Sequence, residues 1–139
     1  FDLQQGGGIY MNCETDNPYS GGQIATAPQG PFACPFEKHL DTKCAQALLD
    51  NFNVCAQAAQ TAASLDYYQN CQNTENQLNS VWILFNNGLL SEADRDAMLQ
   101  VIMARYYGNN SDIGSAFWDA IGDCSASFYA QIGDCCVDD

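Results

Sequence analysis

The residue best suited to acid–base catalysis is the one histidine, His39, which lies in a charged segment between Cys34 and Cys44. Histidine exchanges a proton near neutral pH, and a nearby carboxylate such as that of Asp41 could orient its ring. In a helix, however, positions two apart point about 160° away from each other, so these two side chains would not converge on one substrate. We therefore expect His39 in an exposed, charged turn.

A histidine and an aspartate between two cysteines partly resemble the catalytic pair of secreted phospholipases, which lies on a helix between disulfides. Those enzymes carry the two residues side by side next to a cysteine doublet, together with a glycine-rich calcium loop. Here Leu40 separates His39 from Asp41, and the doublet Cys135-Cys136 is far along the chain. A phospholipase-like lipid hydrolase is thus a distant alternative. We assign no catalytic residue and do not expect an enzyme.

Metal and cofactor sites are not predicted either. A single histidine argues against a histidine-rich metal centre, and the sequence has no C-x-x-C, EF-hand loop, P-loop or Rossmann glycine pattern. Calcium needs only oxygen ligands, which Asp134, Asp138 and Asp139 could offer, but a solvated acidic tail explains these residues better. We expect neither a metal ion nor a cofactor.

The eight cysteines predict a disulfide framework in an oxidising compartment. Cys55 follows Cys44 by eleven residues, and Cys135 follows Cys124 by the same step, in both cases within helical patterns. That step returns a helical side chain to within roughly 20° of its starting direction, about 16 Å further along the axis. Because the Cα atoms of a disulfide lie much closer together than this, the two cysteines of a pair cannot bond each other, and each pair should link its helix to another helix at two points along its length.

Antiparallel packing of the first and last helices predicts the disulfides Cys44–Cys135 and Cys55–Cys124. Other connectivities satisfy the sequence equally well, so this pairing is a geometric preference. The remaining cysteines would then tie down the N-terminal arm and the middle helix: Cys13, Cys34, Cys71 and Cys136.

Helical patterning begins only after an irregular arm. Glycine and proline punctuate residues 1–33, whereas residues 34–139 carry apolar side chains at helical spacing. The stripes predict helices over roughly 41–63, from Tyr68 to Phe85, from an N-cap at Ser91 to about 107, and from Ile113 to Cys135. The expected fold is an all-α, disulfide-rich bundle of about four main helices preceded by the arm.

Two glycines complicate the last of these helices. The tetrapeptide Ile-Gly-Asp-Cys at 121–124 recurs at 132–135. Gly122 and Gly133 each cost a helix about 1 kcal/mol relative to alanine. They therefore suggest either a close approach of another backbone or a break in the helix.

The triplet Asn109-Asn110-Ser111 matches the N-x-S acceptor pattern for glycosylation and falls between two predicted helices. In a secreted chain such a triplet can carry a glycan. Asn109 is therefore a candidate glycosylation site.

Charge and hydropathy limit the partners. Four basic and seventeen acidic residues give a net charge of −13, which would repel nucleic acid and anionic lipid headgroups. No apolar stretch is long enough to span a membrane. Because the chain starts at Phe1 and is rich in cysteine, we expect a processed, secreted, extracellular protein.

Small apolar ligands are one class of partner. Insect odorant carriers resemble this chain in being secreted, acidic, helical and disulfide-linked, but they have a short fixed gap between their second and third cysteines that is missing here. A carrier would hold its ligand between helices. Large apolar side chains could line that cavity: Phe52, Trp82, Phe85, Met98, Ile102, Phe117 and Phe128.

Aromatic residues favour a different function. The tyrosine doublets at 67–68 and 106–107, and Trp118 beside the inward Phe117, are too many to face one core. Exposed aromatics favour protein contacts. We therefore expect a non-catalytic recognition or structural protein that binds another protein or assembles with itself, with an extracellular carrier of a small apolar ligand as the alternative.

Overall fold

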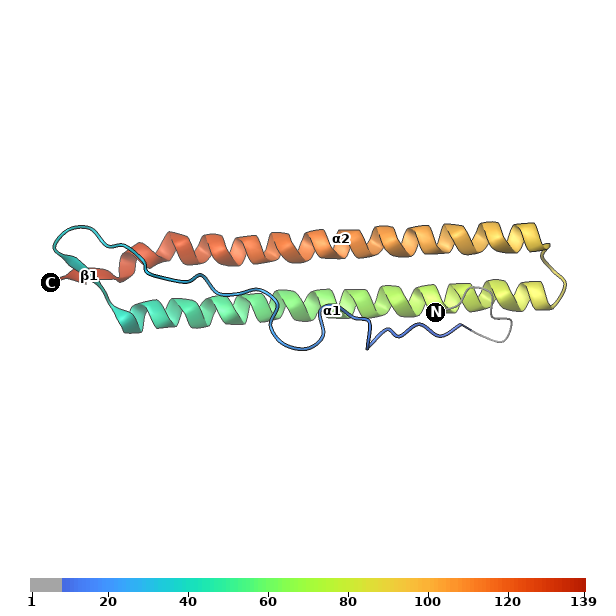
Figure 1. The fold of residues 1–139 in the computed structure, drawn as a ribbon, viewed down its shortest axis with the longest axis horizontal. Helices are drawn as coiled ribbons and strands as arrows, with labels where there is room; N and C mark the ends of the chain where they lie inside the picture. Colours follow the sequence, from blue (N-terminus) through green and yellow to red (C-terminus); the bar gives the residue numbers. More distant parts are fainter. Residues whose placement is uncertain (1–8) are drawn as a thin grey trace. The chain divides into compact units, whose positions relative to one another are not determined.

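The computed structural model describes residues 9–139 of the chain (Figure 1). Two long helices make up most of it, and residues 9–37 form turns and irregular backbone. The elements follow in the order β1 (Lys38–Leu40), α1 (Thr42–Asn86), α2 (Glu92–Ile132), the 3₁₀ helix η1 (Gly133–Cys135) and β2 (Cys136–Asp138). The two strands pair antiparallel, with His39 opposite Val137.

The prediction of about four main helices is wrong, because the described residues contain two long helices. The first two predicted helices merge into α1, since residues 64–67 contain neither glycine nor proline. The last two merge into α2, which continues through Gly108. One glycine costs a helix interior about 1 kcal/mol, and the packing of the flanking residues against α1 outweighs that cost.

Each helix begins at a side-chain cap. The Oδ1 atom of Asp41 accepts a hydrogen bond from the backbone N–H of Lys43 at 3.0 Å, and Ser91 Oγ accepts one from Asp94 at 3.1 Å. These bonds satisfy N–H groups that have no partner within the helix. The predicted N-cap at Ser91 is therefore confirmed, and the carboxylate of Asp41 has a structural role.

Buried side chains recur along both helices in repeating steps of three, four and four residues, a period of eleven. An eleven-residue period gives about 3.67 residues per turn, close to the α-helix's own value, so one face stays inward over a long helix. In α1 the buried positions are Phe52, Ala56, Gln60, Ala63, Tyr67, Cys71, Thr74, Leu78 and Trp82. In α2 the buried or half-buried positions are Leu99, Ile102, Tyr106, Asn110, Ile113, Phe117, Ile121, Cys124 and Phe128.

The chain divides into two compact units, each containing part of both long helices. Among the described residues, the first comprises 9–20 and 63–115. In its described part, Cys13 is bonded to Cys71 of α1, and the backbone N–H and C=O of Ile9 both bond the side chain of Asn79, at 2.6 and 3.0 Å. The arm is thus fixed to α1 through both backbone and disulfide, as the cysteine pattern predicts.

The second unit comprises residues 21–62 and 116–139. Its disulfides include Cys44–Cys135 and Cys55–Cys124, so both predicted links between the first and last helical segments are confirmed. A third disulfide joins the two segments that lead into and out of the helices: Cys34–Cys136.

A buried polar residue also fixes the irregular segment of the second unit. The side chain of Gln60 is 1% exposed; it accepts from the N–H of Ile24 and donates to the carbonyl of Gly22, each at 2.9 Å. Because its amide is paired at both ends, its burial leaves no unsatisfied group.

The structure corrects one expectation about the glycines. A Cβ atom at Gly122 or Gly133 would meet no heavy atom within 4 Å, so no backbone approaches either residue closely. Gly122 lies inside α2, whereas Gly133 marks the change from α2 to η1. Of the two explanations, only a break is found, and only at Gly133.

Replacing Gly122 by alanine should stabilise the protein. The residue is helical and has open space at its Cβ position. Alanine is more favourable than glycine in a helix interior by about 1 kcal/mol, and the free energy of unfolding should rise by about that amount. Urea unfolding with the disulfides intact, followed by circular dichroism, measures the change.

Gly88→Ala is the matched control. Gly88 also has open space, but its φ is +76°, a conformation that alanine adopts only at a cost. The free energy of unfolding of Gly88→Ala should fall, whereas that of Gly122→Ala should rise. A loss of stability in both variants would contradict the assignment of Gly122 to an open helix face.

Candidate functional site

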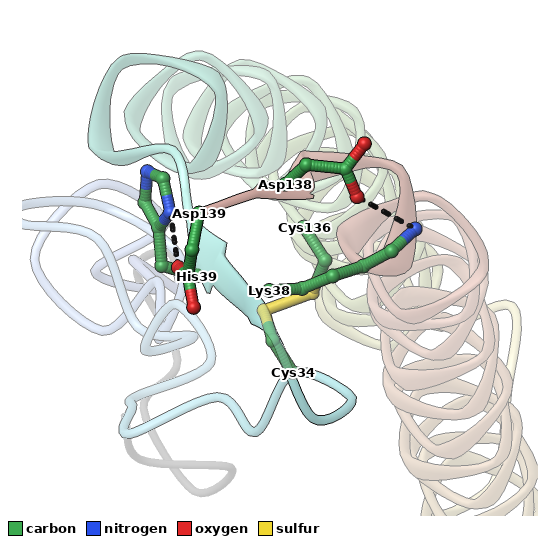
Figure 2. Close-up of polar contacts among 6 residues, drawn as sticks. All are labelled: Cys34, Lys38, His39, Cys136, Asp138 and Asp139. Atoms are coloured by element: carbon green, nitrogen blue, oxygen red, sulfur yellow. Dashed lines mark hydrogen bonds and ion pairs between the residues drawn. A yellow bond between two sulfur atoms is a disulfide. The ribbon is translucent and has the colours of Figure 1, made fainter.

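His39, the catalytic candidate, pairs with the far end of the chain. Its Nδ1 atom lies 2.8 Å from Oδ1 of Asp139, and Lys38 Nζ lies 4.0 Å from Asp138, beside the Cys34–Cys136 disulfide (Figure 2). The side chains of His39 and Asp139 are 58% and 60% exposed. Exposed pairs of this kind contribute little to stability.

Neither a thiol nor Asp41 is available to this pair. All eight cysteines are in disulfides, so the chain has no free thiol, and Asp41 caps α1. Among residues 9–139, no three histidine, cysteine or acidic side chains are grouped as a metal ion would require. The geometry around His39 therefore offers an ion pair between β1 and the end of the chain.

The seven candidate lining residues of a carrier are divided between the two units. Phe52, Phe117 and Phe128 belong to the second unit, and the other four belong to the first: Trp82, Phe85, Met98 and Ile102. Most are buried, but Met98 is 42% exposed, and its neighbour Leu99 takes the inward position.

Two of the three in the second unit line a shallow hollow. Phe52 and Phe128 flank it beside the Cys55–Cys124 disulfide, and its volume is about 50 Å³. That space suits a few water molecules. Pockets for small organic ligands measure about 300–1,000 Å³, so this hollow is too small for such a ligand.

In the first unit, Trp82 and Phe85 hold an arginine. The guanidinium carbon of Arg95 lies 4.9 Å from the ring centre of Trp82 and 4.4 Å from that of Phe85. Two carboxylates on the same helix also pair with its guanidinium, Asp96 at 2.8 Å and Glu92 at 3.5 Å. Arg95 is only 15% exposed, so these aromatics form a cation–π site that the chain fills itself.

A second polar group of the first unit lies between its helical segments. The hydroxyl groups of Tyr67 and Tyr106, both buried, are 3.0 Å apart. Burial, followed by the hydrogen bond with Tyr106, raises the pKa of Tyr67 above the usual value for tyrosine. The phenol of Tyr67 therefore stays neutral in the folded protein under conditions that ionise a free tyrosine.

The predicted glycosylation site lies beside this tyrosine pair. Asn109 is exposed, but it lies inside α2 instead of in a loop between helices, and its Nδ2 donates to Oδ1 of Asn70 at 3.1 Å. Asn70 in turn donates to Asn110 at 2.9 Å and to the carbonyl of Tyr106 at 3.1 Å. A glycan at Asn109 stays a prediction, and attaching it would replace one hydrogen on a paired amide nitrogen.

The most regular surface feature is an aromatic doublet that recurs every eleven residues along α2. In each doublet the first ring is buried and the second is exposed: Tyr106-Tyr107, Phe117-Trp118 and Phe128-Tyr129. The two rings of a doublet meet edge to face, with centres 5.3, 4.9 and 5.4 Å apart in the three cases. A buried neighbour therefore supports each exposed ring.

The doublets belong to a longer tandem repeat that includes the Ile-Gly-Asp-Cys tetrapeptides. Residues 103–113, 114–124 and 125–135 read MARYYGNNSDI, GSAFWDAIGDC and SASFYAQIGDC. Each copy has its doublet at the fourth and fifth positions and an aspartate at the tenth. Aligning the chain with itself at a shift of eleven would have found this repeat.

The exposed members of the repeat combine aromatic rings with negative charge. Tyr107, Trp118 and Tyr129 are 62%, 55% and 58% exposed. The aspartate five residues after each ring is exposed as well: Asp112, Asp123 and Asp134.

Comparison with known proteins identifies no relative: no protein-family model, curated protein or solved structure matches this chain. Within residues 9–139, neither helix is apolar enough over sufficient length to cross a membrane. Four disulfides are typical of proteins in an oxidising environment.

The free energy of unfolding should fall as the pH rises above about 10, the ordinary pKa of tyrosine. The pKa of Tyr67 is raised by folding, so its contribution is complete below the pKa of the unfolded chain and is lost above it. Tyr67→Phe should lose about 1 kcal/mol at neutral pH and show a shallower alkaline decline. Brief urea unfolding at several alkaline pH values tests this.

Tyr10→Phe serves as the control, because Tyr10 is 78% exposed. Its stability and alkaline decline should match those of the unmodified protein. An alkaline decline in Tyr67→Phe as steep as in the unmodified protein would contradict the role given to Tyr67.

Proposed function

We propose that this protein is a secreted, non-catalytic recognition protein that acts through protein–protein contacts on α2. The observation that carries the proposal is the exposure of Trp118 and Tyr129, each supported edge-on by a buried ring. Tryptophan and tyrosine are enriched where proteins meet, because they combine a large apolar area with a polar group. Water contact with such rings is unfavourable, and a partner would remove it.

Rigidity supports the proposal. Trp118 and Tyr129 lie on a helical segment that the Cys55–Cys124 and Cys44–Cys135 disulfides join to α1. The buried partners Phe117 and Phe128 restrict the exposed rings further. A surface that is already ordered loses less conformational entropy on binding, which favours affinity.

Charge favours a different protein over a second copy of the chain. A net charge of −13 makes two identical molecules repel each other. Self-assembly would need contacts strong enough to overcome this repulsion, whereas a neutral or basic partner would meet no such barrier. The disulfides favour an extracellular location for that encounter.

Site-specific photo-crosslinking tests the proposed function. A photoreactive phenylalanine analogue placed at Trp118 or Tyr129 should cross-link a protein when the chain is irradiated in extracellular fluid of its source. An excess of unlabelled protein should compete, and an excess of Trp118→Ala should compete poorly. Val54, which is 71% exposed on α1 of the same unit, is the matched control position and should give no such product.

Native mass spectrometry of the purified protein distinguishes the alternatives. A ladder of oligomers would indicate self-assembly, while the added mass of a small organic molecule would indicate a carrier. Cross-linking at Trp118 no stronger than at Val54, together with a bound organic molecule, would contradict the proposed recognition function.

A further inference from the structure

We propose that the Cys34–Cys136 disulfide, which lies next to β1 (Figure 2), is a reducible clasp in the second unit. It holds residues 26–36, which we call the strap, over Phe128. Reduction of this one disulfide would release the strap and expose apolar surface, while the two long helices keep their structure. The clasp is a conformational device, and it does not depend on the proposed function.

The strap has few attachments to the rest of its unit. None of its residues is buried. A single hydrogen bond in the described part of the chain involves the strap: the N–H of Lys38 donates to the carbonyl of Pro35 at 3.1 Å. The ring of Phe32 packs against that of Phe128, with the ring centres 5.3 Å apart. This ring contact and the disulfide are therefore the main links that keep the strap in place.

The clasp closes only a short loop of its own. Cys135, the neighbour of Cys136, is already bonded to Cys44. With that bond in place, the loop that the clasp closes contains only the stretch from Cys34 to Cys44 and the Cys135-Cys136 doublet. Opening so small a loop frees few residues. Reduction should therefore loosen the strap and the short β1–β2 sheet, whereas the helical segments should stay joined by the other disulfides of the unit.

The surroundings of the four disulfides favour reduction of the clasp before the others. A disulfide resists reduction when the fold buries it and keeps its two sulfurs close together after the bond is broken. Each of the other three disulfides contains a cysteine that is at most 3% exposed: Cys71, Cys124 and Cys135. Cys34 and Cys136 are both half-buried, and they lie in irregular backbone and in a strand of three residues. The fold therefore holds these two sulfurs together least firmly.

The reductant is a dithiol, and the reaction is thiol–disulfide exchange. A thiolate of the dithiol attacks one sulfur of the clasp, the S–S bond breaks, and the other cysteine leaves as a thiolate that takes up a proton. The second thiol of the reductant then displaces the first cysteine from the mixed disulfide. The clasp ends as two thiols and the reductant ends as a disulfide, so two electrons pass to the protein.

Release of the strap would uncover a phenylalanine beside an existing hollow. Phe128 is 3% exposed, and together with Phe52 it lines the hollow next to the Cys55–Cys124 disulfide. Phe32 covers part of the Phe128 ring. Once Phe32 moves away, the uncovered side of Phe128 would extend the apolar lining of the hollow. A reduced molecule would thus present an apolar surface that the oxidised molecule conceals.

Stepwise reduction of the complete chain under native conditions tests the proposal. Samples equilibrated with increasing dithiothreitol are quenched by alkylation, and peptide mapping identifies the modified cysteines. We expect Cys34 and Cys136 to be modified together, at a dithiothreitol concentration about tenfold below the one that opens any other disulfide. The same partly reduced sample should bind the uncharged hydrophobic dye Nile red several-fold more strongly than the oxidised protein, with unchanged helix content by circular dichroism.

Variants separate release of the strap from other effects of reduction. The double substitution Cys34→Ser and Cys136→Ser keeps the other three disulfides and should bind the dye as the partly reduced protein does. Phe32→Ala removes the covering ring and should increase dye binding while the clasp is intact. Phe36→Ala is the matched control, because Phe36 belongs to the same strap but is 93% exposed. It should not increase dye binding.

Several results would overturn the proposal. These are reduction of Cys55–Cys124 before the clasp, reduction of all four disulfides at one concentration, or a partly reduced chain that binds no more dye than the oxidised chain. Loss of helix content in the double serine variant would also contradict a local role of the clasp. None of these results changes the photo-crosslinking expected at Trp118, so failure of the clasp and failure of the proposed function are distinguishable.

Discussion

The eleven-residue period of buried side chains is the constraint on which the rest of the structure depends. Steps of three, four and four residues keep one face of α1 and one face of α2 inward over 45 and 41 residues. A seven-residue period would have required supercoiling to keep such faces together, whereas the eleven-residue period is close to the natural twist of the helix. Long helices without internal breaks are therefore compatible with continuous burial in each unit.

Disulfides in the second unit follow the same period. Cys44 and Cys55 are one period apart on α1, and Cys124 and Cys135 are one period apart in the C-terminal segment, so antiparallel segments bring both pairs together. This pairing could be predicted from the sequence. The eleven-residue period places both cysteines of a segment on the same helix face, and the antiparallel order decides which cysteine of the other segment lies opposite each of them. The number of helices could not be predicted. The local composition at 64–67 and at Gly108 does not reveal that the helix on each side of these positions stays packed and so continues through them. The predicted helix end at Phe85 was correct to within one residue, because α1 ends at Asn86, shortly before Gly88 with its positive φ.

Which of two adjacent apolar residues is buried was harder to predict than the presence of a buried helix face. Met98 and Leu99 are adjacent apolar residues, and either could continue a helical stripe, but the structure buries Leu99 and leaves Met98 42% exposed. The same ambiguity applies within each aromatic doublet, where both rings are large and apolar. Sequence reasoning correctly indicated that Trp118 lies outside while Phe117 lies inside, yet it did not detect that the doublets repeat. That repeat required a comparison of the chain with itself, because each single doublet is unremarkable.

The period that builds the core also makes the surface of α2 periodic, so an exposed ring follows a buried ring in each copy of the repeat. Phe117 is 3% exposed, and truncating such a buried phenylalanine typically costs about 3–5 kcal/mol. Trp118, one residue later, faces solvent and contributes mainly through its edge contact with Phe117. Under the proposed recognition function, a substitution of the exposed ring would change binding, while the buried ring would still maintain the fold. In each copy of the repeat, the buried side chain that helps to hold the helix in place thus also supports the exposed ring.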